Sequence, residues 1–151
     1  MLTEIEGNLL DIEEGVVCQQ VNCRGVMGSG LALAIRNKYP EVYTNYRERY
    51  ERCRAGDHYE LGDAHVISVS PTLFVANLYG QDGYGTGVKQ TNYGALSQAL
   101  FYLKVGGYTQ VHIPYLLGCG LGGGDWAVVS ELIEFYIPEA IIVRLPEASN
   151  G

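Results

Sequence analysis

Apolar residues occur in two kinds of segment that alternate along the chain. Short runs rich in β-branched residues are typical of strands. Between them lie longer segments with apolar positions three or four residues apart, which is typical of helices. The short runs predict strands at 16–21, 64–69, 73–78, 111–113 and 140–145. This alternation predicts an α/β fold, a three-layer α/β/α sandwich with a mixed central sheet.

The longer segments predict four helices. They begin near Gly30, Pro40, Thr91-Asn92 and Asp125. Proline is tolerated in the first turn of a helix, and asparagine and aspartate are good N-caps. Two of the helices are expected to end at the glycine-containing pairs Gly56-Asp57 and Gly106-Gly107.

Length and charge restrict the possible functions. The 151 residues predict a single domain over 1–151, with no linker or internal repeat. The formal charge of −7 argues against general affinity for duplex nucleic acid. An anionic small ligand remains compatible with this charge, because backbone N–H groups bind phosphate without basic side chains. No apolar run approaches the roughly 18 residues of a membrane helix, so no membrane association is expected.

The four cysteines indicate neither a zinc site nor a disulfide framework. They are Cys18, Cys23, Cys53 and Cys119, and no pair has C-x-x-C spacing. We interpret them as reduced thiols of a cytoplasmic protein. No metal and no cofactor is expected.

A glycine-rich loop over 21–30 follows the first predicted strand and runs into a helix. Glycines at 25, 28 and 30 let the backbone approach a ligand, and the helix N-terminus adds a partial positive charge. This favours a diphosphate site, although a tight turn whose glycines only permit packing fits the spacing equally well. The loop lacks the Gly-Lys-Ser/Thr of a P-loop, and Leu33 stands where a dinucleotide fingerprint has its third glycine.

A second glycine-rich loop, over 118–124, repeats this arrangement. It follows the strand at 111–113, and Asp125-Trp126 come just as the next helix begins. Ligands of open α/β sheets bind at the carboxyl ends of the strands, where both loops are expected. The pair therefore favours a pyrophosphate clamp more strongly than either loop alone.

Several motifs in order resemble the macrodomain family, and the resemblance covers nearly the whole chain. Gly7-Asn8-Leu9-Leu10 resembles the opening G-D-[IL]-[TLF] signature, residues 21–32 resemble the first ligand loop, and residues 113–121 resemble the second. The stretch 122–126 is similar to the G-G-D-W form of phage and bacterial ADP-ribose-1″-phosphate processing enzymes. Within the family, the chain most resembles the terminal ADP-ribose glycohydrolase and the DNA ADP-ribosyl glycohydrolase antitoxins.

The resemblance implies ADP-ribose, or an ADP-ribosylated substrate, as the partner. It implies that the adenine lies against Asn8 and Leu9. It places the distal ribose near Asn22, Gly25, Val26 and Met27. The diphosphate is expected between the two loops, against Gly28, Ser29, Gly30, Leu117, Gly118, Cys119, Gly120 and Leu121.

Two positions depart from the family pattern. Where this chain has Asn8, family members usually carry an aspartate that accepts the adenine N6–H. The Asn8 amide oxygen can also accept, but without charge assistance. In the glycohydrolase subgroup a lysine attacks the distal ribose, and an aspartate directly after G-C-G-L resolves the adduct. Lys89 fits the lysine, one residue further from Tyr93 than in that pattern. The aspartate position is Gly122, and the nearest acid is Asp125.

Lys89 and Asp125 are therefore the candidate catalytic residues, with a plain helix N-cap as the alternative for Asp125. The implied activity is hydrolysis at the distal ribose. It would release ADP-ribose from a protein or nucleic acid adduct, or remove a 1″-phosphate or acyl group from ADP-ribose. The glycine at position 122 favours a non-catalytic ADP-ribose-binding module instead. The intact glycine loops weigh against a third alternative, an interaction domain with a vestigial groove.

The remaining polar residues give weaker signals. Arg24 is the only basic residue of the first loop, and a phosphate contact and simple solvation fit it equally. Cys119 is interpreted as a small packed side chain. Tyr79 and Tyr84 fit either stacking on the ligand or ordinary surface positions. The histidines are scattered and follow no catalytic pattern: His58, His65 and His112.

Overall fold

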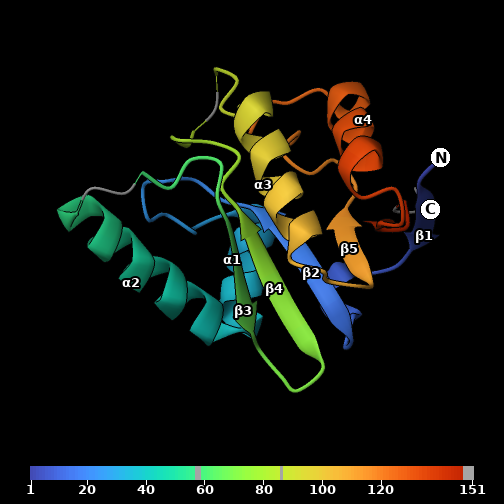
Figure 1. The fold of residues 1–151 in the computed structure, drawn as a ribbon, viewed down its shortest axis with the longest axis horizontal. Helices are drawn as coiled ribbons and strands as arrows, with labels where there is room; N and C mark the ends of the chain where they lie inside the picture. Colours follow the sequence, from blue (N-terminus) through green and yellow to red (C-terminus); the bar gives the residue numbers. More distant parts are fainter. Residues whose placement is uncertain (57–58, 86, 148–151) are drawn as a thin grey trace.

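The computed structural model describes residues 1–56, 59–85 and 87–147, and these form one six-stranded sheet with helices on both faces (Figure 1). The order across the sheet is β1-β6-β5-β2-β4-β3. Every neighbouring pair is parallel except β3 and β4, which form an antiparallel hairpin at one edge. The predicted mixed sheet is therefore confirmed. The strands are β1 (Thr3–Glu6), β2 (Gly15–Gln20), β3 (Ala64–Ser68), β4 (Leu73–Leu78), β5 (Val111–Pro114) and β6 (Ile141–Arg144).

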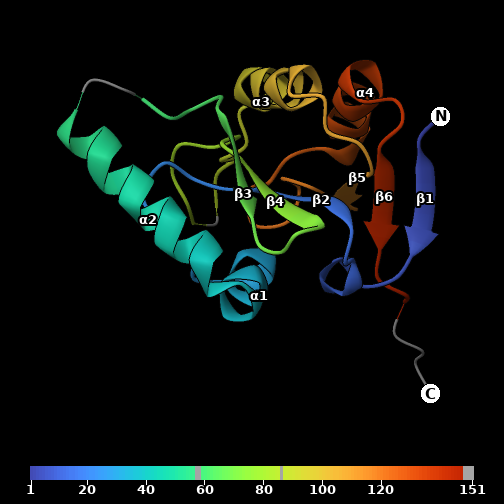
Figure 2. The same cartoon turned by 60° about the horizontal axis from the view of Figure 1, so that its bottom comes forward.

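The helices form the two outer layers. On one face lie α1 (Gly30–Lys38) and α2 (Pro40–Ala55), and on the other lie α3 (Tyr93–Val105) and α4 (Trp126–Tyr136) (Figure 2). A 3₁₀ turn, η1 (Leu9–Asp11), links β1 to β2. This arrangement confirms the three-layer α/β/α sandwich.

Each outer layer has its own apolar core against the sheet. Leu96 and Leu100 of α3 and Val129 and Ile133 of α4 are fully buried in one core. Ile35 of α1 and the side chains of α2 that face the sheet form the other. The buried pairs of α3 and of α4 are each four residues apart, which is the helical spacing, so the amphipathic pattern of each helix selects the face it buries.

The residues predicted to begin two of the helices cap them in the structure. The Asn92 side chain caps α3 by accepting from the Ala95 N–H, and the Asp125 side chain caps α4 by accepting from the Ala127 N–H. Gly56 is the C-cap of α2, while Asp57 and His58 lie outside the described residues. None of the helices in the described part of the chain combines the length and apolarity needed to cross a membrane.

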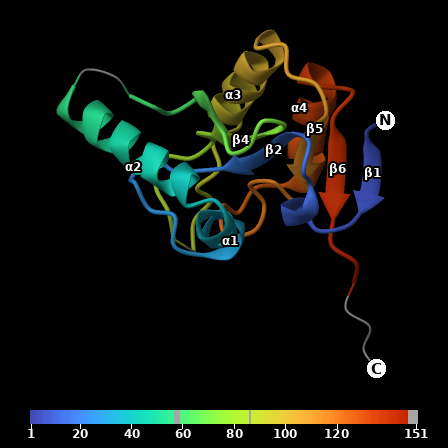
Figure 3. The same ribbon diagram turned by 90° about the horizontal axis from the view of Figure 1, so that it is seen from below.

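The sequence pattern did not predict β1. Its four residues are all exposed, so no apolar periodicity marks them. The strand forms because its backbone pairs with β6 at the edge of the sheet, beside the C-terminal strand (Figure 3). A contact between the two ends of a chain leaves no local sequence signal.

Candidate ligand-binding site

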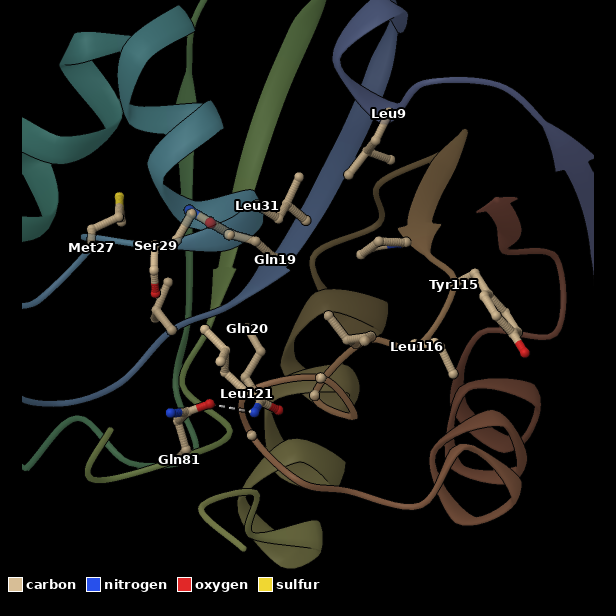
Figure 4. A pocket seen from close by; sticks show the side chains of 18 of the residues that line it. Leu9, Gln19, Gln20, Met27, Ser29, Leu31, Gln81, Tyr115, Leu116 and Leu121 are labelled. Atoms are coloured by element: carbon tan, nitrogen blue, oxygen red, sulfur yellow. Dashed lines mark hydrogen bonds between the residues drawn. The ribbon is translucent and has the colours of Figure 1, made fainter. Parts of the chain in front are cut away.

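A cavity of about 910 Å³ lies at the carboxyl ends of β2, β5 and β6 (Figure 4). These strands are parallel, so their carboxyl ends meet at one edge of the sheet, where α/β folds bind ligands. The two glycine-rich loops face each other across this cavity. It is lined by most of the predicted ligand-binding residues, namely Asn8, Leu9, Asn22, Val26, Met27, Gly28, Ser29, Gly30, Leu117, Gly118, Gly120 and Leu121.

Two predicted ligand-binding residues lie outside the lining, and both pack within the protein. Gly25 has a left-handed φ of 73°, and a side chain there would collide with Arg47 and Tyr50 of α2. Its carbonyl accepts from the Arg47 guanidinium at 3.0 Å, which ties the first loop to α2. Cys119 is half-buried against the core, and its thiol bonds to the Leu117 carbonyl. Burial and the charge of Asp125 raise the pKa of this thiol.

Asn22 organises the first loop (21–30) from within. Its side-chain oxygen accepts from the Arg24 N–H at 2.9 Å and from the Tyr46 hydroxyl at 2.8 Å, while its amide donates to the Val26 carbonyl at 2.7 Å. Every polar atom of this side chain therefore has a partner inside the protein. These bonds hold the backbone of the loop in one conformation beside the cavity.

The first loop ends at the N-terminus of α1, which lies at the cavity. Ser29 is the N-cap residue, with an extended backbone and no side-chain capping bond. The first turn of α1 contains no acidic residue. The uncapped N–H groups and the helix dipole therefore give this wall of the cavity a partial positive charge, which suits a phosphate.

The second loop (118–124) is held by a network of amide and hydroxyl groups behind it. The Gln20 amide donates to Gln81 Oε1 at 2.8 Å and to Thr91 Oγ1 at 2.9 Å, and the Thr91 hydroxyl donates to the Gly118 carbonyl at 2.6 Å. The Gln90 and Thr91 N–H groups both donate to the Gly122 carbonyl. The second loop is thus tied to the end of β2 and to the segment before α3.

The two ends of the cavity differ in chemistry. One end is built from Leu9, Val143 and the ring of Tyr115, with the Arg144 guanidinium 4.1 Å from the centre of that ring. The other is lined by amide side chains, among them Gln81, and by Met27 (Figure 4). No carboxylate occurs among the described residues that line the cavity, and Arg144 is their single charged side chain.

Several of the lining residues were not predicted from the sequence. Gln19 and Gln20 gave a usable signal, because two amides end an otherwise apolar strand. Tyr115 falls within 113–121, the segment that resembles the second ligand loop, but it was not predicted to bind the ligand. Gln81 and Arg144 gave no signal that they line a cavity, because their neighbours in sequence do not set their distance from it. Gln81 follows the end of β4 by three residues, Tyr115 directly follows β5, and Arg144 ends β6; the sheet order brings these strand ends to one edge.

Lys89 and Asp125 meet at Tyr93, outside the lining of the cavity. The Lys89 ammonium lies 4.5 Å from the centre of the Tyr93 ring, and the Tyr93 hydroxyl accepts from the Asp125 N–H at 2.9 Å. The Asp125 carboxylate caps α4. The structure thus brings the two candidate catalytic residues to the same tyrosine, beside the second loop.

Position 122 has no space for the acid that the glycohydrolase pattern carries there. A Cβ added at Gly122 would lie 2.6 Å from Thr91 Oγ1 and 2.7 Å from the Gly118 carbonyl oxygen. The neighbouring Gly120 differs, because a Cβ added there meets nothing within 4 Å. The glycine at 122 is therefore part of the packing between the second loop and Thr91.

The residues with weaker signals fall mostly outside the cavity. Arg24 pairs with Asp82 at 2.6 Å on the surface, where its side chain is 58 % exposed, and it does not line the cavity. Tyr79 is fully buried, whereas Tyr84 lines the cavity and is 57 % exposed. His112 Nδ1 contacts the Val16 carbonyl at 3.1 Å. Neither His112 nor His65 lines the cavity.

Comparison with known proteins assigns the chain to a family. Residues 18–133 match the Macro domain profile, and the chain belongs to that family. Among solved structures, a protein of unknown function from Bacteroides thetaiotaomicron superposes with a TM-score of 0.84 at 27 % identity, covering 97 % of this chain and 98 % of that chain.

Two curated relatives are similar over shorter segments. The DNA ADP-ribosyl glycohydrolase of Mycobacterium tuberculosis is 40 % identical over 52 residues, which cover 34 % of this chain and 15 % of the relative. The ADP-ribose 1″-phosphate phosphatase of Aspergillus clavatus is 45 % identical over 47 residues, which cover 30 % of this chain and 24 % of the relative. The matched segments thus span a quarter or less of the length of these relatives.

Proposed function

We propose that this chain binds ADP-ribose in the cavity and hydrolyses an ADP-ribose derivative at the distal ribose. The observation that carries the proposal is the cavity itself. Two glycine-rich loops face each other across it, one end is apolar, and the other is lined by amides. Membership of the Macro domain family supports this ligand, as do two relatives whose names refer to ADP-ribose.

The chemistry of the walls suggests how the ligand lies. The diphosphate would sit between Gly28–Gly30 and Gly118–Leu121, where the N-terminus of α1 supplies uncapped N–H groups. The base would lie at the apolar end, near Asn8 and Leu9. The distal ribose would lie at the other end, where amide groups match its hydroxyls. The absence of carboxylates from the described lining removes a source of repulsion for an anion.

We propose Lys89 and Asp125 as the residues that act on the distal ribose. Both lie beside the second loop, at the Tyr93 ring and hydroxyl respectively. The Asp125 carboxylate could orient or activate water. The Lys89 ammonium could stabilise the charge of a leaving group.

A second candidate function is supported by Gly122. The acid of the glycohydrolase pattern is absent, and Thr91 and the Gly118 carbonyl occupy the space it would need. This observation favours a non-catalytic ADP-ribose-binding module.

We also propose a cytoplasmic location, supported by four cysteines that are all free.

The test is a binding titration followed by a turnover panel. ADP-ribose is expected to bind at micromolar concentration and NAD much more weakly, because we propose that the distal ribose fills the amide-lined end of the cavity and leaves no room for a nicotinamide. Gly120→Glu should abolish binding, since its carboxylate would project into the cavity and repel the diphosphate. Equal binding of ADP-ribose and NAD, or binding of neither, would refute the ligand assignment.

The turnover panel compares ADP-ribosylated DNA, ADP-ribosylated protein and ADP-ribose 1″-phosphate. Asp125→Asn removes the carboxylate but keeps a good N-cap for α4, so a loss of turnover cannot be ascribed to the helix. We expect a loss of about a hundredfold, the lower bound for general acid–base catalysis. The role of Lys89 is tested with Lys89→Ala. Its matched control is Lys104→Ala, which removes a lysine from the exposed end of α3. No turnover of any substrate by the wild type would leave the binding module as the function.

A further inference from the structure

Four aromatic side chains form a continuous cluster on the outer surface of α3 and α4. The Phe101 ring contacts Tyr102 at a centroid distance of 6.0 Å and Tyr136 at 6.4 Å. The Phe135 ring contacts Tyr136 at 4.9 Å. Val105 follows Tyr102 by three residues and therefore lies on the same side of α3. We call these five residues the aromatic face.

Most of the aromatic face is exposed to solvent. Phe135 is 74 % exposed and Val105 63 %, while Phe101 and Tyr102 are each nearly half exposed. At about 200 Å² for a whole aromatic side chain, these fractions amount to roughly 400 Å² of apolar surface. A standard protein interface takes about 800 Å² from each partner, of which about 60 % is apolar. The aromatic face therefore supplies most of the apolar area that one side of such an interface needs.

The aromatic face lies away from the candidate ligand-binding site. α3 and α4 lie side by side on one face of the sheet, opposite α1 and α2 (Figures 1 and 2). Both helices begin beside the second loop, where the Tyr93 hydroxyl accepts from the Asp125 N–H. The aromatic face occupies their later turns, and none of its residues lines the cavity. A partner bound to this face therefore leaves the cavity open.

Two exposed charges of opposite sign flank the aromatic face, one on each helix. Lys104 follows Phe101 by three residues on α3, and Glu131 precedes Phe135 by four residues on α4. Neither side chain forms an ion pair within the part of the chain that the structure describes. The aromatic cluster thus lies between a free cation and a free anion.

We propose that two copies of this chain associate through the aromatic face as a symmetric dimer, in which Lys104 of each copy lies opposite Glu131 of the other. In a two-fold contact one patch meets its own copy, so the patch must be self-complementary. Apolar surface meets apolar surface here. A two-fold axis through the cluster, at right angles to the line from Lys104 to Glu131, exchanges the two charges and forms two ion pairs. The net charge of −7 on each chain opposes association that lacks such pairing.

The first experiment measures the mass of the protein in solution by sedimentation equilibrium over a range of concentrations. We expect the mass to rise from one chain to two with a dissociation constant of about 10 µM, near the weak limit for interfaces of standard size. Phe135→Ala should weaken the dimer at least about thirtyfold, as expected for an aromatic anchor at the centre of an interface. Leu33→Ala, at an exposed position of α1 on the other face of the sheet, is the control and should leave the dimer unchanged.

The second experiment reverses the charges and tests the arrangement of the two copies. Lys104→Glu places two carboxylates opposite each other at both ends of the contact and should weaken the dimer about tenfold. Adding Glu131→Lys to the same chain restores opposite charges and should return the dissociation constant to within about threefold of the wild-type value. Thermal unfolding of each variant shows whether the fold is intact. ADP-ribose titrations should give the same affinity for the wild type and Phe135→Ala, because the cavity lies elsewhere.

The possible results separate clearly. A mass of one chain at all concentrations up to about a hundred times the expected dissociation constant would overturn the proposal, as would a mass that keeps growing beyond two chains. A dimer that tolerates Phe135→Ala would also overturn it, because the contact would then lie on another surface. Failure of the double charge reversal to restore the dimer would overturn the pairing of Lys104 with Glu131. None of these results bears on ADP-ribose binding, which the titrations test separately.

Discussion

Replacing Gly122 by alanine tests how tightly the second loop is packed. The added methyl group would lie 2.6 Å from Thr91 Oγ1 and 2.7 Å from the Gly118 carbonyl oxygen. These two atoms are the donor and the acceptor of one hydrogen bond, which is 2.6 Å long. The methyl group must therefore either separate them or displace the backbone of the loop.

The expected cost follows from two contributions. Overpacking of a well-packed region costs about 1–3 kcal/mol. Loss of the Thr91–Gly118 hydrogen bond adds about 1 kcal/mol, which gives about 2–4 kcal/mol in total. In a domain of this size, 1 kcal/mol shifts Tm by roughly 2–4 °C. Gly122→Ala should therefore lower Tm by roughly 5–15 °C.

Gly120→Ala is the matched control, because it adds the same methyl group two residues earlier in the same loop. No atom lies within 4 Å of a Cβ at that position, and neither glycine has a positive φ. Calorimetric unfolding of both variants gives the comparison. If the two alanine variants unfold within roughly 2 °C of each other, the loop has space to spare and the reasoning is wrong. In that case Gly122→Asp would also be expected to fit. With the packing described here, Gly122→Asp should instead destabilise the fold and install no activity.

Three further predictions concern other parts of the molecule. Burial raises the pKa of the Cys23 thiol to about 12. At pH 7.4 we therefore expect iodoacetamide to alkylate Cys23 at least about tenfold more slowly than free cysteine. Alkylation of Cys23 as fast as free cysteine would contradict the burial. Hydrogen bonds from Tyr59 and Arg24 lower the pKa of Asp82. The ionised Asp82 carboxylate therefore stabilises the folded protein at pH values above the pKa that Asp82 has in the unfolded chain. The difference in Tm between the wild type and Asp82→Asn should shrink as the pH falls below about 4. A difference in Tm that does not change with pH would refute this prediction. Asn92→Ala removes the cap of α3 and should cost about 1 kcal/mol, measured by urea unfolding, while Asn92→Ser should keep most of the stability.

The local sequence alone determined the elements of the fold and their order. β-branched runs and helical spacing predicted five of the six strands and all four long helices, because each of these elements has a buried face with its own periodicity. Asn92 and Asp125 marked helix starts, since a cap acts on the backbone two or three residues away. The two glycine-rich loops could be placed at one edge because parallel strands bring their carboxyl ends together.

Only the tertiary structure decided which residues of those loops face the cavity. Gly25 and Gly28 look alike in sequence, yet Gly25 packs on Arg47 and Tyr50 of α2 while Gly28 lines the cavity. Position 122 similarly carries no local sign that Thr91 fills the space beside it. These outcomes depend on contacts between segments tens of residues apart. Such contacts are set by how the layers stack, and no spacing within a single segment encodes them.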